Sequence, residues 1–326
     1  MRKLLLGTTA LAAAASLTAN ATLADVSIGG MLEWSYNSRS SNQAALDGTS
    51  FTQDSDYQIN FTNKTDSGLT LGMRIDYNTD AASDNDETSL SISGGFGKIV
   101  LGQDDSAADA YTMDESDLIE EDEAPGVSSM TISTNSEINQ GSADANKIVY
   151  HLPAMGGLTA GISFTDGGAA NTATDTTSYG ARYSMEAAGA AVTLAYATTT
   201  TENSNQDIDA DNMALKVVSG DVSLIISQST YEANDEDREN MGASISYNMP
   251  NGLKIGAYTF TSEDDLDAGE EYERSGAEVV YTIASGLKAV INVDDYEYKL
   301  GTNADAGMAT MSDSGTNSSL TIKASF

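Results

Sequence analysis

The chain has 326 residues, and its 15 Lys and Arg against 49 Asp and Glu give a formal net charge of −34 at pH 7. Nucleic-acid binding needs basic side chains that displace counterions from phosphates, so this charge balance excludes a nucleic-acid partner. The chain has no Cys and a single His, which excludes disulfides, thiol nucleophiles and cysteine-ligated or histidine-rich metal sites. Its 15 Tyr residues and many alternating apolar positions argue against intrinsic disorder.

The first 24 residues have the pattern of a secretory signal peptide. Arg2 and Lys3 precede the apolar run LLLGTTALAAAASL, and small residues follow up to Ala24. Cleavage is expected after Ala24, with Ala21 as the second possible site, which leaves 25–326 as the mature chain. A membrane anchor is the weaker interpretation, because the run is shorter than the roughly 18 apolar residues that cross a bilayer. No later stretch reaches that length, so no transmembrane helix is predicted.

Along the rest of the chain, apolar and polar residues alternate with a period of two. In LTLGMRIDY at 69–77, every second residue from Leu69 to Tyr77 is apolar, and Thr, Gly, Arg and Asp lie between them. The same period recurs at 57–64, 146–152, 179–185, 212–218, 240–249, 277–283 and 287–294. Successive side chains of a strand point to opposite faces, so each segment is predicted to be a strand with one apolar and one polar face. The fold class is therefore all-β.

Short and long connections alternate between these strands. Short turns containing Gly or Asn are predicted at 65–68, 94–97, 154–157, 187–190, 219–221, 250–252 and 284–286. Longer polar and acidic loops are predicted at 38–53, 78–86, 104–144, 165–176, 200–210, 231–238, 263–271 and 299–314. Seven turns and eight loops imply 16 antiparallel strands. Bacterial outer-membrane barrels have an even strand number, short periplasmic turns and long external loops. A barrel of this size leaves an aqueous channel.

A soluble β-sandwich is the alternative fold, because half-buried strands alternate in the same way. Sixteen such strands, with no helix to cover a sheet, favour the barrel. Seven Tyr residues on the apolar faces suit the aromatic girdles of membrane barrels: Tyr57, Tyr77, Tyr150, Tyr179, Tyr183, Tyr247 and Tyr281. The last alternation runs from Leu320 to Phe326 and ends the chain on an aromatic residue. An exported acidic β-sandwich or adhesin that binds Ca²⁺ remains the alternative from another class.

Four parts of the sequence carry a family resemblance: DVSIGGMLEWSYN at 25–37, GKIVLGQDDSAADAY at 97–111, NKIVYHLPAMGGLTAGISF at 146–164 and the terminal Phe326. They resemble Gram-negative general porins, with the closest likeness to the branch of purple α-proteobacteria. The resemblance implies a 16-stranded transmembrane β-barrel in the cell outer membrane that forms a homotrimer and passes small hydrophilic solutes by diffusion. It also implies contact with membrane lipid, lipopolysaccharide and the outer-membrane barrel assembly machinery, with Phe326 expected to serve closure and assembly.

The resemblance further implies that the third long loop, 104–145, folds into the lumen and narrows it. Porins of this kind often oppose such a loop with basic residues on the facing wall. The residues that fit this wall lie on the polar faces of predicted strands: Lys64, Arg74, Arg182, Lys216 and Lys254. This basic set is sparse, which argues against a strong transverse field.

The first part of the long loop is dense in carboxylates: Asp104, Asp105, Asp109, Asp114, Glu115, Asp117, Glu120, Glu121, Asp122 and Glu123. At a constriction these groups would favour cations over anions. A solvated loop face is the alternative, since runs of like charge usually face water. The stretch could also bind Ca²⁺ weakly through its oxygen ligands, although no EF-hand spacing is present. Other acidic clusters at 235–237, 263–265 and 270–271 could be bridged by divalent ions to lipopolysaccharide, or could simply keep the loops solvated.

The sequence offers no catalytic constellation. His151 is the only His, and no GxSxG elbow, dinucleotide fingerprint or phosphate-binding loop accompanies it. It is predicted to be a wall residue that faces the lumen near the periplasmic mouth. The sequence thus predicts a non-enzymatic channel without a cofactor. A substrate-selective channel is the alternative among barrels, and it would carry an aromatic slide with stacked basic residues.

Overall fold

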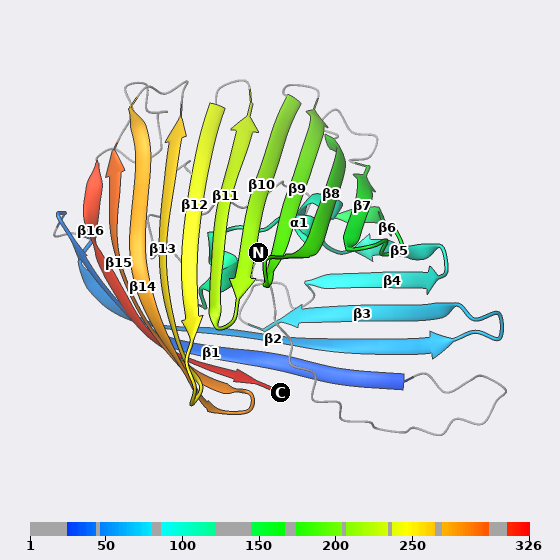
Figure 1. Cartoon of the computed structure of the whole chain (residues 1–326), viewed down its shortest axis with the longest axis horizontal. Coiled ribbons are helices and arrows are strands. Elements are labelled where there is room, and N and C mark those ends of the chain that lie inside the picture. The colour runs from blue at the N-terminus through cyan, green and yellow to red at the C-terminus, as the bar shows by residue number, and fades with distance from the viewer. Residues whose placement is uncertain are drawn as a thin grey trace.

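The computed structural model describes residues 25–43, 46–79, 86–120, 145–166, 174–203, 207–233, 237–264, 269–299 and 312–326. They form a closed antiparallel β-barrel in which each strand pairs with its neighbours in the chain (Figure 1). The expectation of an all-β fold with 16 strands is confirmed. The predicted signal peptide, 1–24, lies outside the described residues. Among the residues described, no helix is long and apolar enough to cross a membrane.

The strands follow one another around the barrel in chain order. They are β1 (Asp25–Ser41), β2 (Gly48–Lys64), β3 (Thr70–Asn78), β4 (Glu87–Gly94), β5 (Gly97–Gln103), β6 (Asn146–His151), β7 (Leu158–Thr165), β8 (Thr174–Ala187), β9 (Ala190–Asn203), β10 (Asp207–Ser219), β11 (Val222–Glu232), β12 (Asp237–Asn248), β13 (Leu253–Asp264), β14 (Glu270–Ala284), β15 (Leu287–Lys299) and β16 (Asp313–Ser325). The helix α1 (Ala107–Tyr111) and the 3-10 helix η1 (Glu115–Leu118) follow β5.

The first and last strands close the barrel. β1 pairs antiparallel with β16 in a continuous register from Met31 opposite Ser325 to Ser41 opposite Gly315. The terminal Phe326 extends this ladder, because its N–H donates to the carbonyl of Gly30 at 2.9 Å. Closure leaves no strand edge with unpaired backbone groups, which a hydrocarbon environment could not satisfy. A two-sheet sandwich, the alternative considered for the sequence, is therefore excluded.

Large apolar side chains lie on the outer face of the barrel and polar ones on the inner face. On β14 and β15, Val279 and Ile291 are exposed, whereas Glu278 and Asn292, one position away, are almost fully buried. The inner face even holds Arg274, which is 4% exposed. This distribution of side chains is the reverse of that in a soluble protein, and it fits a barrel whose outer face contacts lipid.

All seven predicted turns lie between the ends of paired strands. The turn between β8 and β9 is an example: Ala188 and Gly189 both have positive φ, 52° and 81°, as the tight two-residue hairpin turn with the right twist requires.

Several strands run further than their apolar alternation predicts. Most of the predicted loop 38–53 is strand, since β1 continues to Ser41 and β2 begins at Gly48. The predicted loop 200–210 is likewise mostly strand, belonging to β9 and β10. These strand ends carry Ser, Thr, Asn and Asp on both faces, so the hydrophobic period disappears while the backbone ladder continues. Hydrophobic alternation thus marks the apolar belt and not the full strand.

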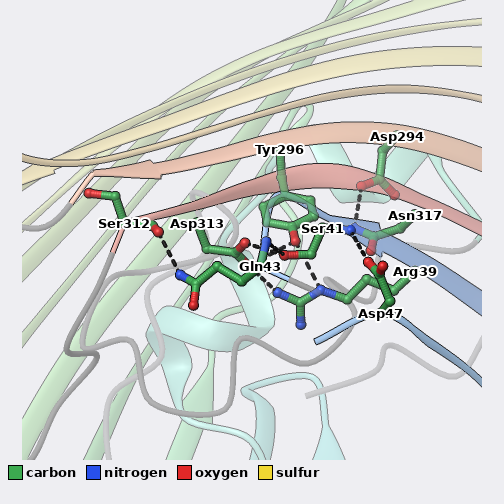
Figure 2. A network of polar contacts seen from close by, with 9 residues as sticks. All are labelled: Arg39, Ser41, Gln43, Asp47, Asp294, Tyr296, Ser312, Asp313 and Asn317. Carbon is green, nitrogen blue, oxygen red and sulfur yellow. Dashed lines mark hydrogen bonds and ion pairs between the residues drawn. The ribbon is translucent and has the colours of Figure 1, made fainter. Parts of the chain in front are cut away.

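A polar network ties the closing strands together at their long-loop end, as Figure 2 shows. Arg39 of β1 forms an ion pair with Asp313 of β16 and donates from Nε to the hydroxyl of Tyr296 on β15 at 2.9 Å. The Tyr296 hydroxyl in turn donates to Asp313 at 2.8 Å, and the Ser41 hydroxyl donates to the same carboxylate at 2.5 Å. Three strands on both sides of the closure therefore share one buried carboxylate.

Replacing this carboxylate is expected to weaken the closure. Asp313 is 3% exposed, and Asp313→Ala removes the ion-pair partner of Arg39 together with acceptors for two hydroxyls. Removing one partner of a buried ion pair costs about 3–5 kcal/mol. We expect the variant barrel to unfold at a clearly lower temperature than the unmodified protein. The measurement is gel mobility as a function of the temperature of heating, since the folded barrel migrates differently from the unfolded chain.

Asp295→Ala is the matched control, because Asp295 lies at the same end of β15 but is exposed on the outer face. Equal unfolding temperatures for the two variants would contradict the role given to the network.

Candidate functional site

Residues 104–120, called here the inner segment, lie along the inner wall of the barrel. The chain leaves β5 at Gln103, and α1 then packs against β6 to β9 while η1 packs against β11 to β13 (Figure 1). The wall residues that it touches, such as Ser163 and Ser178, belong to the polar faces of their strands. The described part of the predicted loop 104–145 therefore passes from one side of the barrel to the other, and residues 121–144 lie outside the described residues.

Two side-chain caps give the inner segment its local shape. Ser106 caps α1 by accepting a hydrogen bond from the Asp109 N–H at 3.1 Å. Asp114 caps η1 in the same way and accepts from the Ser116 N–H at 2.8 Å. Ser and Asp are favoured at such positions because their oxygens satisfy N–H groups that a first helical turn leaves free. Asp114 is thus a buried structural residue and not an exposed charge of the constriction.

Small residues on the wall make room for the inner segment. A Cβ built on Gly180 of β8 or Gly242 of β12 would overlap the Ala107 carbonyl or the Glu115 carboxylate, respectively. A Cβ on Gly161 of β7 would lie 2.8 Å from the ring of Tyr111. Glycine within a strand often marks such a close approach. Glycine at an inward position of a predicted strand is therefore the signal in the sequence for this contact.

Wall side chains also bind the backbone of the inner segment. The hydroxyl of Ser163 accepts from the Ala107 N–H at 2.9 Å, and Arg182 donates from Nε to the Tyr111 carbonyl at 2.9 Å. Glu115 is 3% exposed and accepts from the Ser227 hydroxyl at 3.0 Å. Arg182, predicted to be a basic residue of the pore wall, therefore holds the inner segment in place.

Carboxylates gather around Arg74 where the inner segment begins. Arg74 forms ion pairs with Asp76, with Glu87 at 3.1 Å and with Asp104 at 3.5 Å. Arg74 was predicted to oppose the acidic loop from across the lumen. It lies instead directly beside the start of that loop, and three carboxylates offset its single charge.

Asp105, at the start of the inner segment, is less acidic than an ordinary aspartic acid. Its burial and the neighbouring charges of Asp109 and Asp104 raise its pKa to about 7, against the opposing effect of Arg74. Removing a carboxylate from water and placing it beside like charges both disfavour the ionised form. Part of the predicted acidic charge is therefore titratable near neutral pH.

At its far end, the inner segment meets a cluster of lysines. This lysine cluster consists of Lys254, Lys288 and Lys323 with their partners Glu33, Glu120 and Glu278. Glu120 lies 2.9 Å from Lys288 and 3.6 Å from Lys254. Burial acts to raise the pKa of Glu120, but the hydrogen bond from Lys288 and the nearby lysine charges outweigh it and hold the pKa below its usual range.

Of the lysine cluster, only Lys254 and Glu120 were singled out in the sequence. Lys288 and Lys323 were missed, although each occupies a polar-face position of an alternating strand. A further missed basic residue, Lys147 on β6, is 4% exposed and donates to the Asp104 carbonyl. The alternation of apolar and polar residues predicts that these lysines face inward, but it does not predict their partners on other strands.

The other predicted site residues that the structure describes are spread along the lumen. Lys64 is exposed at the end of β2, and Lys216 is half-buried on the inner face of β10. Asp117 belongs to η1, where its charge acts on Arg182. Glu121, Asp122 and Glu123 lie outside the described residues.

His151 lies on the inner face of β6, in contact with the inner segment. Its Nδ1 is 3.1 Å from the hydroxyl of Tyr111 in α1. Through this contact the His151 ring, which lies on the wall, packs against the inner segment. No three His, Asp or Glu side chains of the described part of the chain are grouped as a metal site would require. Ca²⁺ binding by the acidic stretch stays a prediction.

Comparison with known proteins decides the family. The family described as Gram-negative porin matches residues 7–317. The chain belongs to this family. No curated protein sequence matches it. Because family and fold agree, the protein is an outer-membrane porin whose barrel forms a water-filled channel.

Solved porin structures share the fold at low sequence identity. The anion-selective porin of Comamonas acidovorans is 16% identical, with a TM-score of 0.64 over 93% of this chain and 100% of the other. The trimer form of OmpT, an outer membrane protein of Vibrio cholerae, is 14% identical, with a TM-score of 0.68 over 93% and 99%. A variant of the Rh. blastica porin is 18% identical, with a TM-score of 0.63 over 92% and 100%. At these identities the likeness concerns the fold.

The glycine contacts of the porin's inner segment predict how a single methyl group changes conduction. In Gly242→Ala the new Cβ overlaps the Glu115 carboxylate, so η1 must move away from β12 toward the channel axis. Overpacking of this kind costs about 1–3 kcal/mol. We expect a folded barrel with a lower single-channel conductance in planar bilayers.

Gly95→Ala is the control, since no heavy atom lies within 4 Å of a Cβ at Gly95. If both variants conducted like the unmodified protein, η1 would not border the conducting path.

Proposed function

We propose that this porin is a passive diffusion channel for ions and small hydrophilic solutes that prefers cations to anions. The proposal rests on the charges around the start of the inner segment. Two basic side chains lie there, Arg74 and Lys147, the second on the Asp104 carbonyl, against five carboxylates: Asp76, Glu87, Asp104, Asp105 and Asp109. A ring of carboxylates in a narrow, water-filled passage lowers the electrostatic cost for cations and raises it for anions.

The charges at the other end of the inner segment offset one another. The lysine cluster contains three lysines and three glutamates, so its formal charge is zero. Of the two ends of the inner segment, the acidic one therefore carries the excess charge. Screening extends over about 8 Å in physiological salt, so each group acts mainly on ions that pass close to it.

The position of the inner segment supports a narrowed lumen. Its backbone crosses from β5 to the wall of β13–β16 inside the barrel, and its side chains take up space that a bare 16-stranded barrel would leave to water. We propose that residues 104–145 form the constriction and that solutes pass beside the inner segment.

A substrate-selective channel is less well supported. The inner face does carry a group of aromatic residues, Phe260, Tyr272, Tyr296 and Tyr298, but they are only 1–4% exposed. Rings packed against one another offer little surface to a passing sugar or peptide. Neither the packing nor the family supports an enzyme, and we propose a channel that acts without catalysis or a cofactor.

The reversal potential in a planar bilayer under a KCl gradient tests the ion preference. We expect cation selectivity at pH 8, where Asp105 is ionised, and a weaker preference at pH 6, because a group with a pKa of about 7 is mostly protonated there. In Asp105→Asn, the change in selectivity between pH 8 and pH 6 should be smaller than in the unmodified protein, because one carboxyl group that titrates in this range has been removed.

Asp295→Asn, on the outer face, serves as the charge-matched control and should keep the pH dependence of the unmodified channel. Anion selectivity of the unmodified protein would overturn the proposed preference. A pH dependence as large in Asp105→Asn as in the unmodified channel would assign the titration to another group.

We also propose that the porin is a homotrimer. Strand β6 has six residues and β5 has seven, so neither spans more than about 25 Å even without tilt. The apolar band of an outer-membrane barrel is about 25 Å tall, and tilted strands of this length cannot fill it. Leu101 of β5 and Ile148 of β6 are exposed on the outer face of these two short strands, and a neighbouring copy would cover them. The trimer form of OmpT has the same fold.

Native mass spectrometry of the detergent-solubilised protein tests the assembly. Three copies per particle are expected, and Ile148→Arg should reduce the trimer in favour of monomers because it places a charge in the proposed contact. Ile291→Arg, on the outer face of β15, is the control. A monomer for the unmodified protein in mild detergent would overturn the proposal.

The remaining partners follow from the outer-membrane location. We propose that the outer face contacts lipid and lipopolysaccharide and that Phe326, which is 69% exposed beyond the end of β16, is accessible to the barrel assembly machinery.

A further inference from the structure

The inner face of β2 is accessible along the strand. Its inward-facing residues are half-buried or exposed from the long-loop end to the short-turn end: Thr52, Asp54, Asp56, Gln58, Asn60, Thr62 and Lys64. Gln58 donates from Nε2 to Asp76 of β3 at 3.2 Å, and Asp76 forms an ion pair with Arg74. The outer face of the strand carries the exposed ring of Phe51 instead. Strand β2 therefore presents a continuous row of polar side chains to the lumen.

The wall on the opposite side of the lumen is covered. In the order of the closed barrel, β10 and β11 lie eight strands away from β2 and β3. The inward-facing side chains in the middle of these far strands are buried, since Asn212 and Ile225 are 0% exposed and Ser229 is 3% exposed. The inner segment packs on this side, with α1 on β8 and β9 and η1 on β11 and β12. The inward-facing residues of β3, in contrast, are half-buried throughout. Water in the described part of the lumen therefore lies along β2 and β3.

Two carboxylates belong to the row on β2. Asp54 and Asp56 lie toward its long-loop end, about 7 Å apart, because each residue of a strand advances the chain by about 3.4 Å. The register places Glu33 of β1 opposite Asp54 and Asn78 of β3 opposite Asp56. Glu33 is bound by Lys323 at 2.8 Å, so this pair adds no net charge. An ion that follows this wall therefore passes the charges of Asp54 and Asp56.

We infer that the conducting path runs along β2 and β3 and that Asp54 and Asp56 are specificity-determining residues on it. Both are wall residues outside the inner segment. The family resemblance implies a basic wall, which Lys64 alone of this row fits, and the two carboxylates give the wall the opposite sign. The inference rests on the proposed diffusion channel and deepens it, because it names the wall that ions and solutes contact.

Cysteine substitution tests the path, because the unmodified chain contains no Cys and each variant then has one thiol. Gln58→Cys places the thiol on the inner face of β2, and Ser229→Cys places it on the buried inner face of β11. We expect a water-soluble methanethiosulfonate to react with Gln58→Cys at least about ten times faster, because buried thiols are inert. Labelling of Gln58→Cys should also lower the single-channel conductance. Gel mobility before heating checks that both variants are folded, and equal reaction rates would overturn the path.

Asp56→Cys tests the charge, because its thiol can carry two adducts of similar size and opposite sign. We expect the K⁺/Cl⁻ permeability ratio of the unlabelled variant to lie about twofold below that of the unmodified channel, as the loss of one screened charge near the path would produce. A sulfonate adduct, which restores a negative charge, should raise the ratio again. A trimethylammonium adduct should lower it further. The same order is expected for Asp54→Cys.

Asp295→Cys is the matched control, because Asp295 lies on the outer face near the long-loop end of β15. Neither of its adducts should change the ratio. If the two adducts gave equal ratios in Asp54→Cys and in Asp56→Cys, the specificity role would be overturned. The reversal potential of the unmodified channel alone decides the cation preference, whereas the difference between adducts decides the role of Asp54 and Asp56 whichever ion the channel prefers.

Discussion

The backbone ladder between β1 and β16 is the interaction on which the rest of the barrel depends. Hydrocarbon offers no hydrogen-bond partners, so a sheet can stand in a membrane only when its first and last strands pair. Once they do, the period of two assigns every strand residue to lipid or to lumen. A slip of one residue would turn Glu33 and Lys323, which pair at 2.8 Å inside the barrel, toward the lipid. The chain therefore has one acceptable register.

Closure also concentrates charge inside the barrel, where charges must be matched. Arg274 and Asp294 are both 3% exposed in their side chains and lie 3.1 Å apart, and Arg39 and Asp313 pair at the closing strands. Uncompensated, such groups would cost several kcal/mol each. The inner segment is subject to the same condition. Its carboxylates Asp104, Glu115 and Glu120 meet an arginine, a hydroxyl and lysines of the wall, and glycines such as Gly180 leave room for its backbone.

The predictability of the structure follows from the range of the interactions. The strands and turns depend on neighbours in sequence, so alternation and residues such as Gly189 predict them well. Strand ends such as 200–203 lose the signal because both faces are polar there. The site depends on contacts between distant strands. The sequence places Arg74 and Lys254 on inner faces, but it does not show that Arg74 sits among three carboxylates or that Lys288 and Lys323 join Lys254 around Glu120.

The charge that an ion encounters in this porin therefore differs from the charge that the sequence displays. Of the ten carboxylates predicted for the constriction, Asp114 and Glu115 are buried in structural contacts and Glu120 is matched by lysine. Asp105 is only partly ionised at neutral pH. Among the described members of that set, what remains besides Asp117 is a smaller acidic group beside Arg74, at the opposite end of the inner segment from the lysines. Selectivity then depends less on the number of acidic residues than on which of them the wall leaves uncompensated, and that choice is made by a few inward-facing basic side chains.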